Sequence, residues 1–308
     1  MKRYIIFFLL IFALHSAYAQ NVTIDGLKYY LYADTHVANI DWRNAWVGEL
    51  DIPSEIQHNG ETFTVNSMAA GAFYHCVELT RVMIPKTIDH IVNHVLSDDP
   101  NIGGAISPFY MNPFWGCTTL VSIEVDENNP SMRSVEGALF SKDGSSLYCY
   151  PIGKRQEAYT IPDGVEWIGG NAFSLNQYLT TLTIPSSIKH IYNDAISYCS
   201  KLKDVYCYAD NVPTTNYDAF MECPIASATL HVPAGSVSLY KSTAPWSCFG
   251  NIVAISDGGT SIKAYSGNKP LSPIYDLSGR KIDSSLFTLH SSLKRGLYIQ
   301  NGKKVAVK

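Results

Sequence analysis

The sequence predicts a solenoid of β-rich coils with short helical or 3-10 turns and a period of 23 residues. The main observation is a repeat between Thr160 and Ile196, in which every apolar position returns 23 residues later. The first copy contains Ile161-Pro162, Val165, Ile168 and Ala172-Phe173, and the second contains Ile184-Pro185, Ile188, Ile191 and Ala195-Ile196. A constant period of about 20–29 residues is typical of solenoids, in which each coil buries its apolar face against the next.

The composition agrees with this fold class, because 46% of the 308 residues are hydrophobic and only 16% are charged. A chain of this kind can bury a large core. Once Lys2 and Arg3 of the predicted leader are set aside, 21 Lys and Arg residues stand against 27 Asp and Glu, a net charge near −6. No basic patch and no Arg run interleaved with aromatic residues occurs, which argues against nucleic acid as a partner.

Residues 1–19 are predicted to be a signal peptide. Lys2-Arg3 is a basic start, residues 5–14 are apolar, and Ala17-Tyr18-Ala19 is a cleavage signature before Gln20. The apolar run is too short for a spanning helix, and no later stretch is long and apolar enough to cross a membrane. We therefore expect export to the outer cell surface or the extracellular medium, with the periplasm as the alternative.

Residues 20–47 alternate apolar and polar side chains around short turns, which predicts two or three antiparallel strands that form an N-terminal β cap. The solenoid itself is expected over residues 48–255. In its second coil the central ring arrives late, since Phe73 and Phe114 are 41 residues apart, 18 more than one period. This surplus predicts an inserted loop over residues 92–111.

A second irregularity lies between Phe114 and Phe173, which are 59 residues apart, 13 more than two periods. Two alternating runs flank the turn signal Asp143-Gly144 there, which predicts that a β-hairpin over residues 130–153 replaces a normal coil. The last coil is expected to run from Asp218 to Pro233. Gly- and Ser-rich residues 256–270 predict a flexible linker, and residues 271–308, with the turn signal Asn301-Gly302, a small C-terminal β tail.

Each coil is expected to follow one plan. An Ile-Pro pair ends a strand, because proline has no backbone N–H to donate. Two Ile or Val residues three positions apart then point inward across a tight bend. An Asn or Asp before the alanine begins a short helical turn as its N-cap. An aromatic residue fills the centre of the coil.

Four cysteines share one slot, three residues after the central ring or the Ile196 that replaces it: Cys76, Cys117, Cys199 and Cys223. Asn176 takes this slot in the fifth repeat, and an alternation of Asn and Cys predicts an inward-facing ladder of buried free thiols. Disulfides stay open as the alternative, because export favours them and neighbouring coils could bring Cys199 close to Cys223.

Three cysteines lie outside this ladder, and the sequence does not pair them: Cys149, Cys207 and Cys248. Cys149 and Cys207 are flanked by tyrosines in strand-like runs. We expect both to be packed thiols rather than reactive ones.

The unit Ile-Pro-x-x-Val-x-x-Ile-x-x-x-Ala-Phe-x-x-Cys-x-x-Leu resembles the BspA-like leucine-rich repeat of surface proteins from anaerobic gut and oral bacteria. The resemblance covers roughly residues 48–255, and the run from Val205 to Trp246 is similar to the final coil of the family. It implies a leucine-rich-repeat solenoid and an adhesin or host-matrix binder, without binding residues common to the family. The segments 275–280 and 296–299 resemble carboxy-terminal modules of type IX-like sorting, which implies a sorting-like tail.

Candidate sites for chemistry are sparse. His90 and His94 have the spacing of a metal clamp on a helix, but no Glu lies between them and the context favours a strand or bend. Asp98-Asp99 and residues 126–129 could hold calcium, yet they fit turns better and lack the spacing of an EF-hand. No nucleophile elbow and no phosphate-binding loop in strand–loop–helix context is found. We expect no enzyme activity, no cofactor and no metal.

Binding is the function that the pattern favours. The chain has 20 tyrosines and five tryptophans, more than a lean repeat core needs, although most could fill coil centres and caps. The candidate partner-binding residues lie in the insert and in one strand-like run: Asp98, Asp99, Phe109, Tyr110, Tyr206 and Tyr208. We expect at least one of the rings of Tyr206 and Tyr208 to face inward.

Two hypotheses follow for the partner. The first is an adhesin-like monomer that recognises a protein of a host or neighbouring cell. The second is a glycan-binding module of a polysaccharide-uptake system. The sequence identifies neither the ligand nor the face of the solenoid that binds it.

Overall fold

The computed structural model describes residues 20–92 and 112–255, together with four short strands near the C-terminus. The chain divides into two compact units, residues 1–257 and 258–308. Strands β21 (Ile274–Asp276), β22 (Lys281–Ile282), β23 (Gly296–Gln300) and β24 (Lys303–Val307) form an antiparallel sheet in the second unit. The predicted signal peptide, most of the predicted insert and the predicted linker lie outside the described residues, so those domain boundaries stay predictions.

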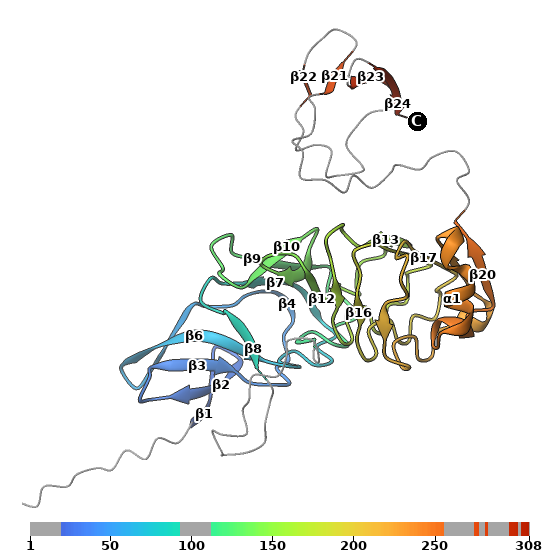
Figure 1. Ribbon diagram of the computed structural model, residues 1–308. Coiled ribbons are helices and arrows are strands. Elements are labelled where there is room, and N and C mark those ends of the chain that lie inside the picture. Colours follow the sequence, from blue (N-terminus) through green and yellow to red (C-terminus); the bar gives the residue numbers. More distant parts are fainter. Residues whose placement is uncertain are drawn as a thin grey trace, which may run out of the picture. The chain divides into compact units, whose positions relative to one another are not determined.

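The first unit is a β-solenoid of about nine turns with a period of about 23 residues and little helix, as the sequence predicts. Figure 1 shows its coils side by side from β12 (Ser146–Cys149) to β20 (Asn251–Ala254). One wall is a parallel sheet of β13 (Ala158–Thr160), β15 (Thr181–Ile184), β17 (Asp204–Cys207), β19 (Thr229–Val232) and β20. The structure therefore adds one strand, β20, beyond the last coil that the sequence predicts.

The other wall of these coils is a second sheet. Its strands β12, β14 (Trp167–Ile168), β16 (His190–Ile191) and β18 (Thr214–Thr215) pair in parallel. In the earlier coils a parallel sheet of β4 (Gly48–Asp51), β7 (Leu79–Ile84) and β9 (Ser122–Val125) takes the place of the first wall. Each coil thus supplies short strands with a bend between them.

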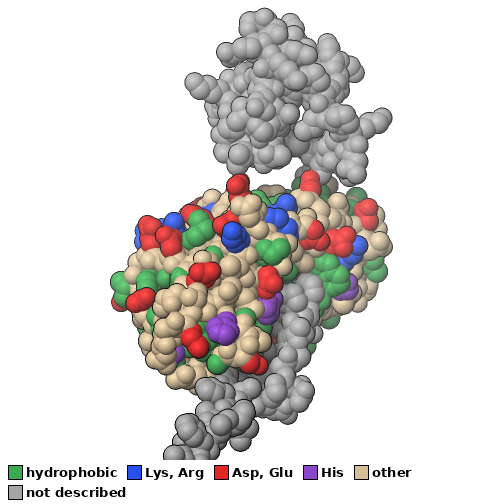
Figure 2. Space-filling view, turned by 90° about the vertical axis from the view of Figure 1, so that its left-hand side faces the viewer, with side chains coloured by type: hydrophobic (Ala, Val, Ile, Leu, Met, Phe, Trp, Pro, Cys, Tyr) green, Lys and Arg blue, Asp and Glu red, His purple; other side chains and the backbone are tan. Residues whose placement is uncertain are grey.

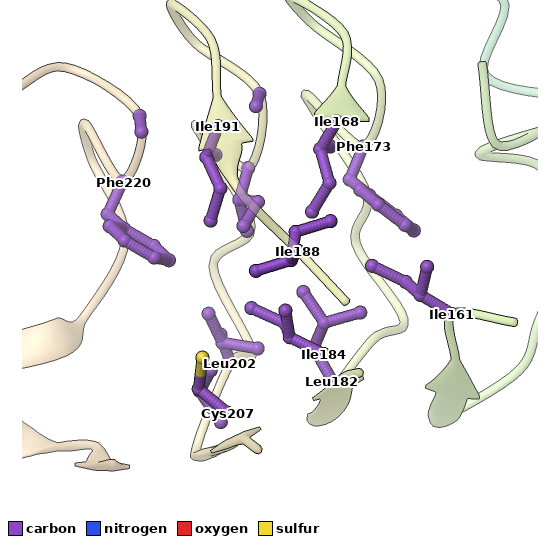
Figure 3. Packing of buried hydrophobic residues seen from close by; sticks show 14 of the residues in the cluster. Ile161, Ile168, Phe173, Leu182, Ile184, Ile188, Ile191, Leu202, Cys207 and Phe220 are labelled. Carbon is purple, nitrogen blue, oxygen red and sulfur yellow. The ribbon is translucent and has the colours of Figure 1, made fainter. Parts of the chain in front are cut away.

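The expected plan of a coil is confirmed at the strand ends and in the core. Strands β7 and β15 end at Ile84 and Ile184, each directly before a proline. The inward pair Ile188 and Ile191 is 4% and 1% exposed, and the central ring of Phe173 is fully buried. Figure 3 shows such side chains from successive coils pointing toward one another inside the solenoid. The 23-residue period therefore places equivalent apolar groups in register along the core.

The turns around the central ring differ from the short helix that the sequence predicts. The residue before the alanine is left-handed in three coils, with φ of 73° at Gly71, 58° at Asn171 and 54° at Asp194. Asn, Asp and Gly tolerate this conformation best, so the residue bends the chain instead of capping a helix. The helical elements of the described solenoid all lie near its C-terminal end: η1 (Ile225–Ser227), η2 (Ala234–Ser236), α1 (Val237–Ser242) and η3 (Trp246–Cys248).

A β-hairpin of β11 (Ala138–Ser141) and β12 turns at Asp143-Gly144 and lies between two cores. β10 (Met132–Val135), β11 and β12 pair as antiparallel neighbours. Leu139 packs with the N-terminal cluster of buried residues, whereas its neighbour Phe140 packs with the C-terminal cluster. Because successive side chains of a strand point to opposite sides, one hairpin contributes to both cores.

We predict that Gly153→Ala destabilises the junction after this hairpin. A Cβ at this position would lie 2.6 Å from the carbonyl oxygen and 2.7 Å from the nitrogen of Leu120, backbone atoms that cannot swing away. We expect a loss of about 1–3 kcal/mol in the free energy of unfolding, measured by urea denaturation. Gly235→Ala is the matched control, since no heavy atom lies within 4 Å of its added Cβ. Equal stability of the two variants would contradict the proposed backbone contact.

The N-terminal strands form a mixed sheet. β1 (Gln20–Ile24), β2 (Leu27–Tyr32) and β3 (Val37–Ile40) are antiparallel neighbours, and β3 continues in parallel to β6 (Glu61–Ala69). β6 also pairs with β5 (Glu55–His58) and β8 (His90–Val92). The capping role expected for residues 20–47 stays a prediction. Among the described residues, no helix has the length and apolar character needed to cross a membrane.

Candidate functional site

A row of polar and aromatic side chains lies on the outer side of the parallel sheet around β17. Val205 and Cys207 point into the core and are fully buried, so Asp204 and Tyr206 point outward. Strand register sets Tyr206 beside His231 of β19, and His231 beside Val253 of β20. We call the surface formed by Asp204, Tyr206, Tyr208, His231 and Val253 the Tyr206 face.

Two rings of this face are held in place by contacts with each other and with a carboxylate. The rings of Tyr206 and His231 stack with centroids 4.1 Å apart and an angle of 7° between their planes. His231 Nε2 also lies 2.9 Å from Asp204 Oδ1, which orients the imidazole. Cross-strand aromatic pairs of this kind stabilise a sheet and present a pre-shaped surface.

The expectation that one of the two tyrosine rings faces inward is wrong. Tyr206 is half-buried and Tyr208 is 44% exposed, whereas Cys207 between them is fully buried. Residues two apart in a strand share a face, so the inward position of Cys207 places both neighbours outside. Tyr206 and Tyr208 therefore lie on one surface, on which His231 separates Tyr206 from Val253, a residue that is 40% exposed.

The corresponding sheet of the earlier coils carries paired charges instead. Arg81 of β7 lies 2.8 Å from Asp51 of β4 and 3.3 Å from Glu124 of β9. Figure 2 views the side of the N-terminal strands and shows acidic and basic side chains interspersed with hydrophobic and uncharged ones. The Tyr206 face has one carboxylate, Asp204, and that carboxylate is engaged by His231.

A second group of rings lies on the turn side of the N-terminal coils, and the sequence analysis missed it. We call Trp42, Arg43, Tyr74, His75 and Trp115 the Trp115 cluster. The guanidinium of Arg43 lies 3.9 Å from the ring centre of Trp42 and 5.2 Å from that of Tyr74. Tyr74 and His75 lie 4.8 Å and 5.0 Å from the ring of Trp115. A usable signal is the residue directly after the central ring, which is Tyr74 after Phe73 and Trp115 after Phe114.

Hydrogen bonds and a close backbone contact fix two members of the Trp115 cluster, Trp115 and His75. The indole Nε1 of Trp115 donates to Ser174 Oγ at 3.0 Å, and Ser174 Oγ hydrogen-bonds Ser197 Oγ at 2.9 Å. Gly116 has φ of 79°, and a Cβ there would lie 3.0 Å from the ring of His75. The imidazole of His75 therefore packs against the backbone of Gly116, where any larger residue would crowd the ring.

The cysteine ladder is confirmed as a packing device. All seven cysteines are free thiols; Cys76, Cys117 and Cys199 are buried, and Cys223 is half-buried. The thiols of Cys117, Cys199 and Cys223 donate to the carbonyl of the central residue of the preceding coil, at 3.0, 3.4 and 2.8 Å. Asn176 uses the same slot differently, since its side-chain oxygen accepts from the N–H groups of Tyr178 and Leu179.

The two cysteines in tyrosine-flanked runs are packed thiols, as expected. Cys149 and Cys207 are 1% and 0% exposed. Burial raises the pKa of Cys149 to about 12 and that of Cys207 to about 11. A thiol with so high a pKa carries almost no thiolate at neutral pH, so neither sulfur is a nucleophile.

Four of the six predicted binding residues, Asp98, Asp99, Phe109 and Tyr110, lie outside the described residues, and so does His94. His90 lies in strand β8, as its context predicts, and contacts Asp89. In the turn at residues 126–129, Asp126 Oδ1 accepts the N–H of Asn128 at 2.8 Å. Within residues 20–92 and 112–255, no group of three or more His, Cys, Asp or Glu side chains is placed to hold a metal ion.

Comparisons with known proteins point to one family. The model for the BspA type leucine rich repeat region matches residues 54–144 and 153–243 in six copies. No curated protein matches the chain.

Solved structures that match the chain include a leucine rich cell surface protein from Faecalibacterium prausnitzii. It is 15% identical, with 79% of this chain and 96% of that chain covered and a TM-score of 0.36. A leucine-rich repeat protein from Bacteroides ovatus is also 15% identical, with 76% of each chain covered and a TM-score of 0.32. A leucine rich repeat protein from T. pallidum is 22% identical, with 70% and 73% covered and a TM-score of 0.30.

Proposed function

The chain belongs to the BspA-type leucine-rich repeat family, and from this premise we propose that it is an exported, adhesin-like protein that binds a protein partner through its solenoid surface. The observation that carries the proposal is the Tyr206 face. Its stacked rings are fixed before any partner arrives, so little side-chain entropy is lost when they are covered. Tyrosine is also among the residues that contribute most to binding at protein interfaces.

The chemistry of this face favours a partner surface with little charge. Asp204 is paired with His231, and the neighbouring outward side chains of β15 are Thr181 and Thr183. Such a surface offers ring edges, hydroxyl groups and the apolar side chain of Val253. It suits a protein with apolar and hydrogen-bonding groups, and it lacks the cationic side chains that nucleic acid needs.

The proposed location follows from the leader-like residues 1–19, and it is the outer cell surface or the extracellular medium, with the periplasm as the alternative. We propose a monomer that displays its solenoid to proteins of host or neighbouring cells. The matched family is a repeat family, and the repeat fold is a scaffold rather than a catalytic one. Binding rather than turnover is therefore the activity to measure.

The Tyr206 face predicts a specific loss of binding. Surface proteins retained by the immobilised protein would be identified, and the purified partner titrated against variants. Tyr206→Ala combined with Tyr208→Ala is expected to weaken binding at least about 10-fold, since two outward-facing rings are lost. Tyr217→Ala is the control, because Tyr217 is 86% exposed but lies outside the face, in the turn before Phe220. Unchanged affinity of the double variant would contradict the proposal.

The insert is the other part of the proposed binding surface, with Asp98, Asp99, Phe109 and Tyr110 as its candidate contacts. Deletion of residues 94–110 is a second arm of the same titration. We expect weaker binding with an unchanged melting temperature. Full affinity after the deletion would leave the Tyr206 face as the sole candidate.

A second candidate function is glycan binding in a polysaccharide-uptake system, and the Trp115 cluster favours it. Rings anchored as Trp115 is, beside the exposed Arg43 and His75, are suited to stack on sugar rings and to donate to their oxygens. A glycan array probed with the wild-type protein and with Trp115→Ala tests this candidate. Saturable binding to a defined oligosaccharide, lost in the variant, would favour it over the protein partner.

A further inference from the structure

Two cysteines of consecutive coils lie next to each other at the C-terminal end of the ladder. The N–H of Cys199 donates to the sulfur of Cys223 at 3.4 Å, and the two thiols are hydrogen-bond partners. The backbones beside them are in register, because Ile196 donates to Ala219 at 2.9 Å and Tyr198 donates to Met221 at 2.8 Å. Segments paired in this way lie about 5 Å apart, within the range of Cα separations that a disulfide accepts.

We propose that Cys199 and Cys223 form a redox-active dithiol site, which a small disulfide oxidises to a Cys199–Cys223 bond that links two coils. This inference is independent of the proposed function. Cys223 is half-buried and Cys199 is fully buried, so an external reagent reaches Cys223 first. The site therefore has an outer cysteine, Cys223, that can attack the reagent, and an inner one, Cys199, that can resolve the mixed disulfide.

The chemistry balances with a low-molecular-weight disulfide as the oxidant. The thiolate of Cys223 attacks one sulfur of the reagent, forming a mixed disulfide and releasing one thiolate. The sulfur of Cys199 then attacks Cys223, which forms the intramolecular bond and releases the second thiolate. The two protons of the original thiols pass to the two released thiolates, and the two electrons reduce the reagent.

The environment of the two sulfurs supports this order. The hydrogen bond from Cys199 lowers the pKa of Cys223, although burial and the neighbouring Glu222 act in the opposite direction. That same hydrogen bond, together with burial, raises the pKa of Cys199. Cys223 is therefore the sulfur that becomes a thiolate first, and it is also the more accessible one.

A second ladder pair in the same slots provides an internal comparison. Cys76 and Cys117 belong to consecutive coils whose central rings, Phe73 and Phe114, stack with centroids 5.5 Å apart. Both residues are buried, with 5% and 0% of their surface exposed, and burial raises the pKa of both thiols. An external disulfide therefore meets no accessible thiolate there, and this pair should stay reduced.

The test uses the full chain with Cys248→Ser, because Cys248 is exposed and would react by itself. The protein is incubated with oxidised glutathione, unfolded in the presence of an alkylating reagent, and analysed by intact mass and non-reducing peptide mapping. We expect loss of two alkylation sites without a retained glutathione, and a linked peptide pair containing Cys199 and Cys223. The melting temperature should rise by about 5 °C or more, as the bond closes a loop of one coil.

The single-cysteine variants separate the two roles. With Cys199→Ser, glutathione should remain attached at Cys223, and with Cys223→Ser, Cys199 should stay reduced. Circular dichroism melts of both reduced variants check that the coils still fold. Alkylation of both cysteines after oxidation, a glutathione retained on Cys223 of the parent, or a bond between Cys76 and Cys117 would each overturn the proposal.

Discussion

Replacing Trp246 with alanine is expected to lower the free energy of unfolding by about 3–5 kcal/mol, the typical cost of removing a buried indole. Trp246 is fully buried in η3, at the end of the solenoid. Its ring lies 5.2 Å from Phe220 and 5.3 Å from Tyr240, both in edge-to-face contact. Its Nε1 donates to Thr215 Oγ1 at 3.1 Å, so the residue joins the last coils through both packing and a hydrogen bond.

The loss of stability in Trp246→Ala should be local to the coils around Trp246 and should not extend over the whole solenoid. In a solenoid each coil contacts only its neighbours, and Trp246 belongs to the C-terminal cluster of buried residues. Hydrogen exchange should therefore speed up in β17 and β19 while β7, in the N-terminal cluster, keeps its protection. Trp246→Phe is the control, with an expected loss of about 1–2 kcal/mol for a smaller ring without the N–H. A uniform loss of protection would contradict the local role.

The 23-residue repeat could be predicted because every coil has to meet the same physical requirement. Every coil must bury an apolar centre and end its strands without exposing donors, so Phe173 and the Ile184-Pro185 pair return in fixed phase. The hairpin at Asp143-Gly144 was predictable for another reason, since its turn signal lies between alternating runs. In both cases, local chemistry and the long-range fold impose the same pattern.

Features that depend on contacts between coils were not predictable from a single coil. The hairpin of β5 and β6 turns at Asn59 and Gly60, whose φ angles of 50° and 83° suit a tight turn. This turn is local and does not depend on contacts between coils, and its Asn-Gly pair is a hairpin signal within the first repeat. The Trp115 cluster draws its rings from three separate stretches of the chain, and no spacing within one coil reveals that they meet. The outward position of Tyr206 is a local feature by contrast, because strand alternation places the neighbours of an inward Cys207 on the outer side.

Asn129→Ala is expected to lower the free energy of unfolding by about 3–5 kcal/mol, because four backbone groups, two of them buried, would lose a partner. Asn129 is fully buried. Its Nδ2 donates to the carbonyls of Pro85 and Ile88, at 3.0 and 2.7 Å. Its Oδ1 accepts the N–H groups of Ser131 and Met132, at 3.0 and 2.8 Å. One side chain thus ties the coil containing β7 to the start of the hairpin.

Chemical denaturation of three variants tests whether the donor or the acceptor bonds of Asn129 contribute more to the free energy of unfolding. Asn128→Ala is the matched control next in the chain, and its exposed side chain should cost less than about 0.5 kcal/mol. Asn129→Asp keeps the acceptor but turns a carboxylate toward two carbonyl oxygens, so its pKa in the folded state should rise above the unfolded value. Protonation then favours the folded state, and the deficit of this variant should shrink as the pH falls below that raised pKa. A pH-independent deficit, or equal losses for Asn128→Ala and Asn129→Ala, would show that the donors of Asn129 do not hold the two coils together.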